Sequence, residues 1–164
     1  MRMFILGLLV LTSLTGVGYW QLSNIPLDSQ LEISKNAKWY DDYFTIEYLD
    51  ANTIAIGEPR YYQKNYNYLI LGEEKAILFD TGPGVRNIRP LVKSLTSLPI
   101  TVIASHLHYD HIGNHDKFEN VALLDTPQIR LQTQGQIFSP SHAQHLGIIE
   151  GFNKPAFNVS EWLS

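Results

Sequence analysis

Three histidines and an aspartate stand within one six-residue segment of this chain. Residues 106–111 read His-Leu-His-Tyr-Asp-His, directly after the apolar run 100–104. That run follows Pro99 and ends at polar residues, which is the pattern of a buried strand. Imidazole and carboxylate groups are ligands that zinc prefers. The chain must therefore fold so that a strand end presents these side chains together. The alternative is a polar loop whose histidines only cap and hydrogen-bond.

The spacing within the segment suits more than one metal ion. His106 and His108 are two residues apart, so in an extended segment their side chains point to the same side. Asp110 and His111 follow where the chain turns towards a short helix through Gly113, and they point to a second position nearby. Such an arrangement fits two metal ions a few ångströms apart.

The composition limits the class of protein. The 164 residues are enough for one hydrophobic core and too few for two ordinary domains. Hydrophobic residues make up 45% and charged residues 17%, which indicates a globular protein. A net charge of −4 gives no electrostatic case for binding nucleic acid. The absence of cysteine excludes disulfides, thiolate zinc ligands and a cysteine nucleophile.

The first twenty residues predict the compartment. Arg2 precedes the apolar stretch 4–17, a pattern typical of a secretory signal peptide, and cleavage after Gly18 satisfies the small-residue rule. Uncleaved, residues 4–20 are short for a membrane span. We therefore expect residues 1–20 to be a signal peptide or membrane anchor, and the protein to be exported (periplasmic or secreted) or membrane-anchored. A buried N-terminal helix of the domain is the alternative.

Short strands are expected after a polar lead-in or linker at residues 21–43. Alternating, β-branched and aromatic residues indicate extended segments separated by turns, which predicts an antiparallel meander. The expected strands are residues 44–49, 53–56, 66–71 and 76–79.

The hydrophobic period then changes. Apolar residues three and four apart between 85 and 98 predict an amphipathic helix. Pro90 fits only its first turn, so the helix begins near Arg89, and Pro99 ends it. The buried strand 100–104 follows. One more strand (121–124), a short helix (127–132) and a stretch with short helices to about 158 complete the expectation.

A second segment of interest is Asp80-Thr81-Gly82, at the end of the strand 76–79. On its own, this sequence is common in turns and helix caps. Beside a histidine cluster it has a further interpretation, because metal-bound imidazoles need acceptors that fix their tautomer and orientation. Asp80 is the expected acceptor.

Residues 78–82 and 106–114, in this order and separation, resemble the metallo-β-lactamase superfamily of metallohydrolases. The His-x-His-x-Asp-His motif is highly specific, and the Asp-Thr-Gly motif is supportive. The resemblance covers about residues 44–164. It implies an α+β fold: the N-terminal half of an αβ/βα metallo-β-lactamase sandwich, with a mostly antiparallel sheet and flanking helices.

The resemblance also implies the site and its chemistry. His106 and His108 would bind a first zinc ion, and Asp110 and His111 a second, so that one or two ions are held. Asp110 is also assigned as the catalytic residue, and Asp80 lies beneath the ligands as a supporting carboxylate. A metal-bound hydroxide would cleave an ester, lactone, amide or related bond of a small-molecule substrate.

The resembled family supplies further ligands from its second half, and this chain ends at Ser164, where that half begins. We therefore expect a truncated domain, two protein ligands for each metal where a catalytic zinc usually has three, and an uncovered apolar face. A complementing C-terminal half is the expected partner. The alternatives are a non-catalytic metal-binding fragment that needs a partner chain and, more remotely, a structural exported protein.

Other polar residues carry weaker expectations. His115 either assists the site on a helix face or is solvated. His142 and His145 are expected on one face of a short helix, as ordinary surface residues. The alternative is that one of them donates a third metal ligand. Asp125 is interpreted as a strand-end turn residue. Four tyrosines either fringe the site or pack on the sheet: Tyr61, Tyr62, Tyr66 and Tyr68.

Overall fold

The computed structural model describes residues 31, 33–140 and 156–164. The expected leader at residues 1–20 lies outside the described residues, as do His142 and His145. Within the described ranges, no helix is both long enough and apolar enough to cross a membrane.

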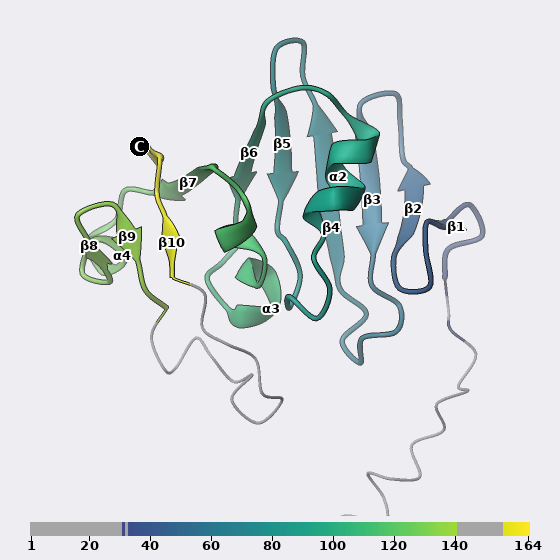
Figure 1. Cartoon of the computed structure of the whole chain (residues 1–164), viewed down its shortest axis with the longest axis horizontal. Coiled ribbons are helices and arrows are strands. Elements are labelled where there is room, and N and C mark those ends of the chain that lie inside the picture. Colours follow the sequence, from purple (N-terminus) through teal and green to yellow (C-terminus); the bar gives the residue numbers. More distant parts are fainter. Residues whose placement is uncertain (1–30, 32, 141–155) are drawn as a thin grey trace, which may run out of the picture. The chain divides into compact units, whose positions relative to one another are not determined.

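Eight strands form the main sheet, in the order β1-β2-β3-β4-β5-β6-β7-β11 (Figure 1). Pairings from β1 to β5 are antiparallel, and those from β5 through β6 and β7 to β11 are parallel. The expected antiparallel meander is thus confirmed, and β1 lies within the stretch expected to be a lead-in. The strands are β1 (Lys38–Trp39), β2 (Thr45–Tyr48), β3 (Thr53–Gly57), β4 (Tyr66–Leu71), β5 (Ala76–Phe79), β6 (Ile100–Ile103), β7 (Asn120–Leu124) and β11 (Glu161–Leu163).

The helices are short and their ends follow local chemistry. Helix α2 (Arg89–Leu95) has Pro90 in its first turn and ends before Pro99, as expected. Three further turns complete the helical part of the described chain: α3 (Tyr109–Ile112), the 3₁₀ turn η1 (His115–Lys117) and α4 (Pro127–Arg130).

The expectation of short helices after residue 132 is wrong for residues 133–138. These form the hairpin of β8 (Thr133–Gln134) and β9 (Ile137–Phe138), and β10 (Phe157–Asn158) pairs with β9 to make a small second sheet. The turn between β8 and β9 contains Gly135 at φ +62°, a conformation that glycine adopts without steric cost and that tight hairpins need.

One face of the main sheet carries the hydrophobic core. Helix α2 lies over this face of the sheet (Figure 1), and its residues Leu91 and Val92 are buried in the core. One residue from each of four neighbouring strands forms a row in register, and every member is at most 1% exposed: Ile54, Leu69, Leu78 and Val102. Burying such side chains stabilises the fold by roughly 1.5–3 kcal/mol each.

The opposite face of the same strands is apolar as well but more accessible. The next row in register, Tyr68, Phe79 and Ile103, is only partly buried, and Ile70 is 40% exposed. The expected α+β architecture, with helices flanking a sheet-dominated domain, is therefore observed, and the helix-covered face contributes most of the core.

A buried carboxyl group supports the loop that leads to the site. Glu58, directly after β3, is 1% exposed, and its two oxygens accept hydrogen bonds from the Tyr43 hydroxyl (2.9 Å) and the Asn67 amide (3.0 Å). Burial raises the pKa of Glu58 to about 7. Gly82, at φ +66°, packs against this group so closely that a Cβ would lie 1.8 Å from Glu58 Oε1.

The substitution Glu58→Gln tests this burial through the pH dependence of stability. Folded wild type keeps the Glu58 proton up to about pH 7, whereas the unfolded chain loses it near 4.5, so wild-type stability falls as pH rises between these values. The Glu58→Gln variant has no proton to release at this position, so its stability does not decrease for this reason. Its free energy of unfolding relative to wild type should rise with pH across this window, by up to ~1.4 kcal/mol per pH unit. Urea denaturation at several pH values measures the difference, and a difference independent of pH would contradict the assignment.

Candidate metal centre

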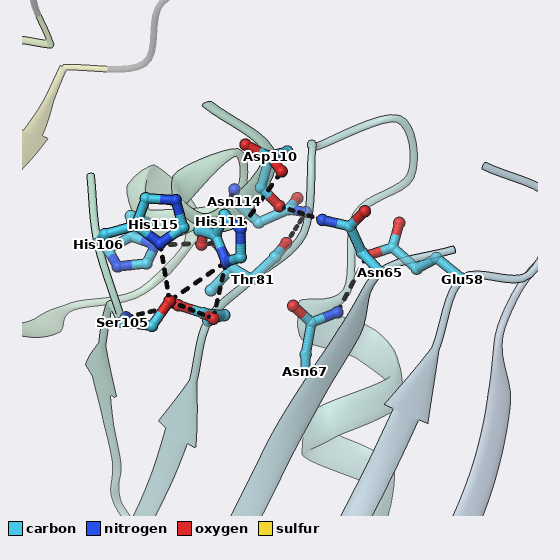
Figure 2. Close-up of polar contacts among 11 residues, drawn as sticks. Glu58, Asn65, Asn67, Thr81, Ser105, His106, Asp110, His111, Asn114 and His115 are labelled. Carbon is cyan, nitrogen blue, oxygen red and sulfur yellow. Dashed lines mark hydrogen bonds and ion pairs between the residues drawn. The ribbon is translucent and has the colours of Figure 1, made fainter. Parts of the chain in front are cut away.

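The predicted site residues gather where two neighbouring parallel strands end. Asp80 directly follows β5, and Ser105 and His106 follow β6, which pairs with β5 in parallel register. Carboxyl ends of parallel strands meet at one edge of a sheet, which explains why two motifs separated by more than twenty residues come together. Figure 2 shows Ser105, His106 and His111 grouped at this edge.

Asp80 is buried and links Ser105 to His111 through hydrogen bonds to its carboxylate. Its carboxylate accepts hydrogen bonds from the Ser105 backbone N–H (2.7 Å) and hydroxyl (2.8 Å), and from His111 Nδ1 (2.8 Å). Burial alone would raise the Asp80 pKa, but these hydrogen bonds outweigh it and hold the pKa below its usual value. Asp80 adopts φ +65°, uncommon for a residue other than glycine and typical of strain held at functional sites.

The three imidazoles of the motif lie together. The ring centroid of His106 is 4.6 Å from that of His108 and 4.0 Å from that of His111. The Ser105 hydroxyl lies 3.1 Å from His106 Nδ1. Because the single hydroxyl proton is directed to Asp80, His106 Nδ1 is the donor in this contact, and Nε2 is the nitrogen that can bind a metal.

His111 is oriented by carboxylates on both of its nitrogens. Nδ1 contacts Asp80, and Nε2 lies 3.3 Å from Asp110 Oδ2. Hydrogen bonds that the ring donates to the carboxylates, first of Asp110 and then of Asp80, raise the pKa of His111 to about 9. Burial raises the pKa of Asp110, but the hydrogen bond with His111 outweighs this effect, so the pKa lies below its usual value. The predicted partnership of Asp80 with a motif histidine is thus present in the geometry.

The turn that carries Asp110 and His111, α3, is held by the segment after β5. Thr81 donates to the His111 carbonyl through both its backbone N–H (2.8 Å) and its hydroxyl (3.2 Å). Gly113 N–H donates to the Gly82 carbonyl (2.8 Å), and the Asn114 amide donates to the Thr81 carbonyl (2.9 Å). Sequence reasoning identified Asp80 in this segment and missed the role of Thr81, which depends on a tertiary contact.

His115 serves the interior rather than the metal centre. It is fully buried, its Nδ1 lies 2.8 Å from Thr81 Oγ1, and its ring packs 5.1 Å from Phe157. Burial lowers its pKa to about 3, so the ring is neutral. The expectation of a solvated His115 is wrong, because Thr81 and Phe157 enclose it.

Asp125 lies outside the site, whereas two of the four tyrosines contact it. Asp125 follows β7 and pairs with Arg130 (2.7 and 2.8 Å), as expected of a strand-end residue. Among the tyrosines, Tyr61 and Tyr62 reach the hydroxyl of Tyr109 on α3, at 3.2 and 3.1 Å. The tyrosines at positions 66 and 68 lie on strand β4 instead.

The donors are close but not arranged around one point. Among residues that the structure describes, no group of three or more histidine, aspartate or glutamate side chains has an arrangement that could hold a metal ion. The donor types nevertheless fit zinc, because three imidazoles and one carboxylate stand together. The contact at Nδ1 of His106 leaves its Nε2 for a metal, and His111 would bind one through Nε2 in place of its contact with Asp110.

Comparison with known proteins agrees with the two motifs. Residues 63–122 match the family model described as the metallo-beta-lactamase superfamily. The search of curated proteins found no match. Among solved structures, the metallo-β-lactamase MIM-1 from Novosphingobium pentaromativorans is 18% identical with a TM-score of 0.52, over 84% of this chain and 49% of that one.

A second solved structure, of DIM-1 metallo-β-lactamase exposed to ceftazidime, is 14% identical with a TM-score of 0.42, over 74% of this chain and 52% of its own. The chain thus spans about half the length of the solved proteins it matches. Sequence identity below 20% to MIM-1 establishes a shared fold only. The family-model match covers the segment that holds both motifs, so this part of the chain is similar to the metallo-β-lactamase superfamily, and the chain shares the fold of MIM-1.

Proposed function

We propose that the 106–111 site binds zinc and that the chain is, by chemistry, a zinc-dependent hydrolase of esters, lactones, amides or related bonds. One observation carries the proposal. Three imidazoles and the Asp110 carboxylate meet at the ends of two parallel strands, and Asp80 hydrogen-bonds the Nδ1 of His111. A buried carboxylate on the far nitrogen of an imidazole is the usual support for a metal ligand.

Each residue has a distinct role in this proposal. His106 and His108 would hold one ion, and Asp110 with His111 a second. Zinc would supply Lewis acidity and activate water near neutral pH. Asp80 keeps the Nδ1 proton on His111 and thereby directs Nε2 towards the ion. Ser105, bonded to Asp80, orients His106 in the same way.

Zinc content tests the ligand assignment. The variants His106→Ala and Asp110→Asn each remove a donor, so bound zinc per chain should fall well below that of wild type, measured by atomic absorption after dialysis against buffer of defined free zinc. Asp125→Asn is the matched control, because it removes a carboxylate that bonds only Arg130 among the contacts described. Equal zinc content in all four proteins would contradict the assignment.

Hydrolysis tests the reaction. Purified chain should cleave at least one probe among an aryl ester, a lactone and a β-lactam faster than the uncatalysed rate. A chelator should abolish the rate, and added zinc should restore it, because activated water depends on the ion. Zinc-loaded protein without any rate above background would remove the catalytic part of the proposal for this chain.

A second candidate is a metal-binding module that acts only with a partner polypeptide. The accessible apolar face around Ile70 and Phe79 favours it. Zinc binding without hydrolysis, together with hydrolysis on addition of a polypeptide that covers this face, would distinguish it from the first candidate.

A further inference from the structure

The ligand turn α3 has a second attachment besides Thr81. A four-residue turn makes few hydrogen bonds of its own. The carbonyl of Asp110 has no helical partner, because the N–H of Asn114, four residues on, donates to Thr81 Oγ1 instead (3.1 Å). The Asn65 side-chain amide donates to this carbonyl at 2.8 Å (Figure 2).

The loop between β3 and β4 presents Asn65 from a fixed frame. Its ends are joined by the hydrogen bond from Glu58 N–H to the Asn65 carbonyl (2.9 Å). Inside the loop, Tyr61 N–H donates to the Glu58 carbonyl (3.0 Å), and Lys64 N–H donates to the Tyr61 carbonyl (2.8 Å). Because Glu58 itself is buried against Gly82, the loop is anchored in the core on the side of the metal centre.

The same loop contacts α3 at a second point. The hydroxyls of Tyr61 and Tyr62 lie 3.2 and 3.1 Å from that of Tyr109, the first residue of α3. Tyr61 and Tyr109 are buried, whereas Tyr62 is 67% exposed. Two consecutive residues of the ligand turn are therefore held by one loop, one through a side chain and one through the backbone.

From these contacts we infer that Asn65 is a positioning residue for the metal centre, which sets the backbone of Asp110 and so the direction of its carboxylate. The inference rests on the proposed zinc site and extends it to a loop that contributes no ligand. Groups that orient metal ligands typically affect metal affinity by about 10- to 100-fold. Asn65 acts on Asp110 directly and on His106 and His108 only through the turn.

The test compares Asn65→Ala with Asn120→Ala. Asn120 also donates its amide to a backbone carbonyl, that of Ile100 (3.4 Å), on strand β7 outside the site. Zinc affinity is measured by competition with a chromophoric chelator, and stability by urea denaturation of the metal-free proteins. Only Asn65→Ala should lose about 10- to 100-fold in zinc affinity, while both variants lose comparable stability.

Tyr62→Phe gives a second variant that removes the hydroxyl in contact with Tyr109 and preserves packing. It should lower zinc affinity in the same direction by a smaller factor. Wild-type zinc affinity in both Asn65→Ala and Tyr62→Phe would overturn the inference, as would an equal loss in Asn120→Ala. Absence of zinc binding by wild type would instead contradict the proposed function itself, so the two failures are distinguishable.

Discussion

The double hydrogen bond from Thr81 to the His111 carbonyl is the contact on which the site depends. The turn α3, which carries Asp110 and His111, is a single helical turn, which is unstable by itself in water. Thr81 joins it to the end of β5, and Gly82 accepts a further hydrogen bond from Gly113. Because β5 is a central strand of the sheet, the positions of His111 and Asp110 follow from the position of the core.

Conformational strain at the end of β5 serves the same purpose. Asp80 and Gly82 both adopt positive φ angles, of +65° and +66°. The first turns a carboxylate towards Ser105 and His111, and the second allows the backbone to lie against buried Glu58. For Asp80, which is not a glycine, this conformation costs about 1–3 kcal/mol and persists because the hydrogen bonds of Asp80 and Thr81 hold it. Gly82 adopts it without that cost.

Much of the fold, and the proximity of the motif side chains to one another and to Asp80, could be predicted from the sequence because local signals were strong. The alternating strand at 66–71 and the helix bounded by Pro90 and Pro99 were found where expected. The three-residue strand β11 has no periodicity of its own and forms only by pairing with β7. Likewise, Asn65, Thr81 and Ser105 act through contacts distant in sequence. Only the position of Ser105 beside His106 offered a local hint.

The most direct test of the zinc site is nitrogen-15 NMR of the histidine rings during a zinc titration. The account predicts that zinc shifts the ring signals of His106, His108 and His111 and leaves the buried His115 unchanged, since that ring faces Thr81. Unmoved signals for the three motif histidines at saturating zinc, or a shift of His115 equal to theirs, would contradict it.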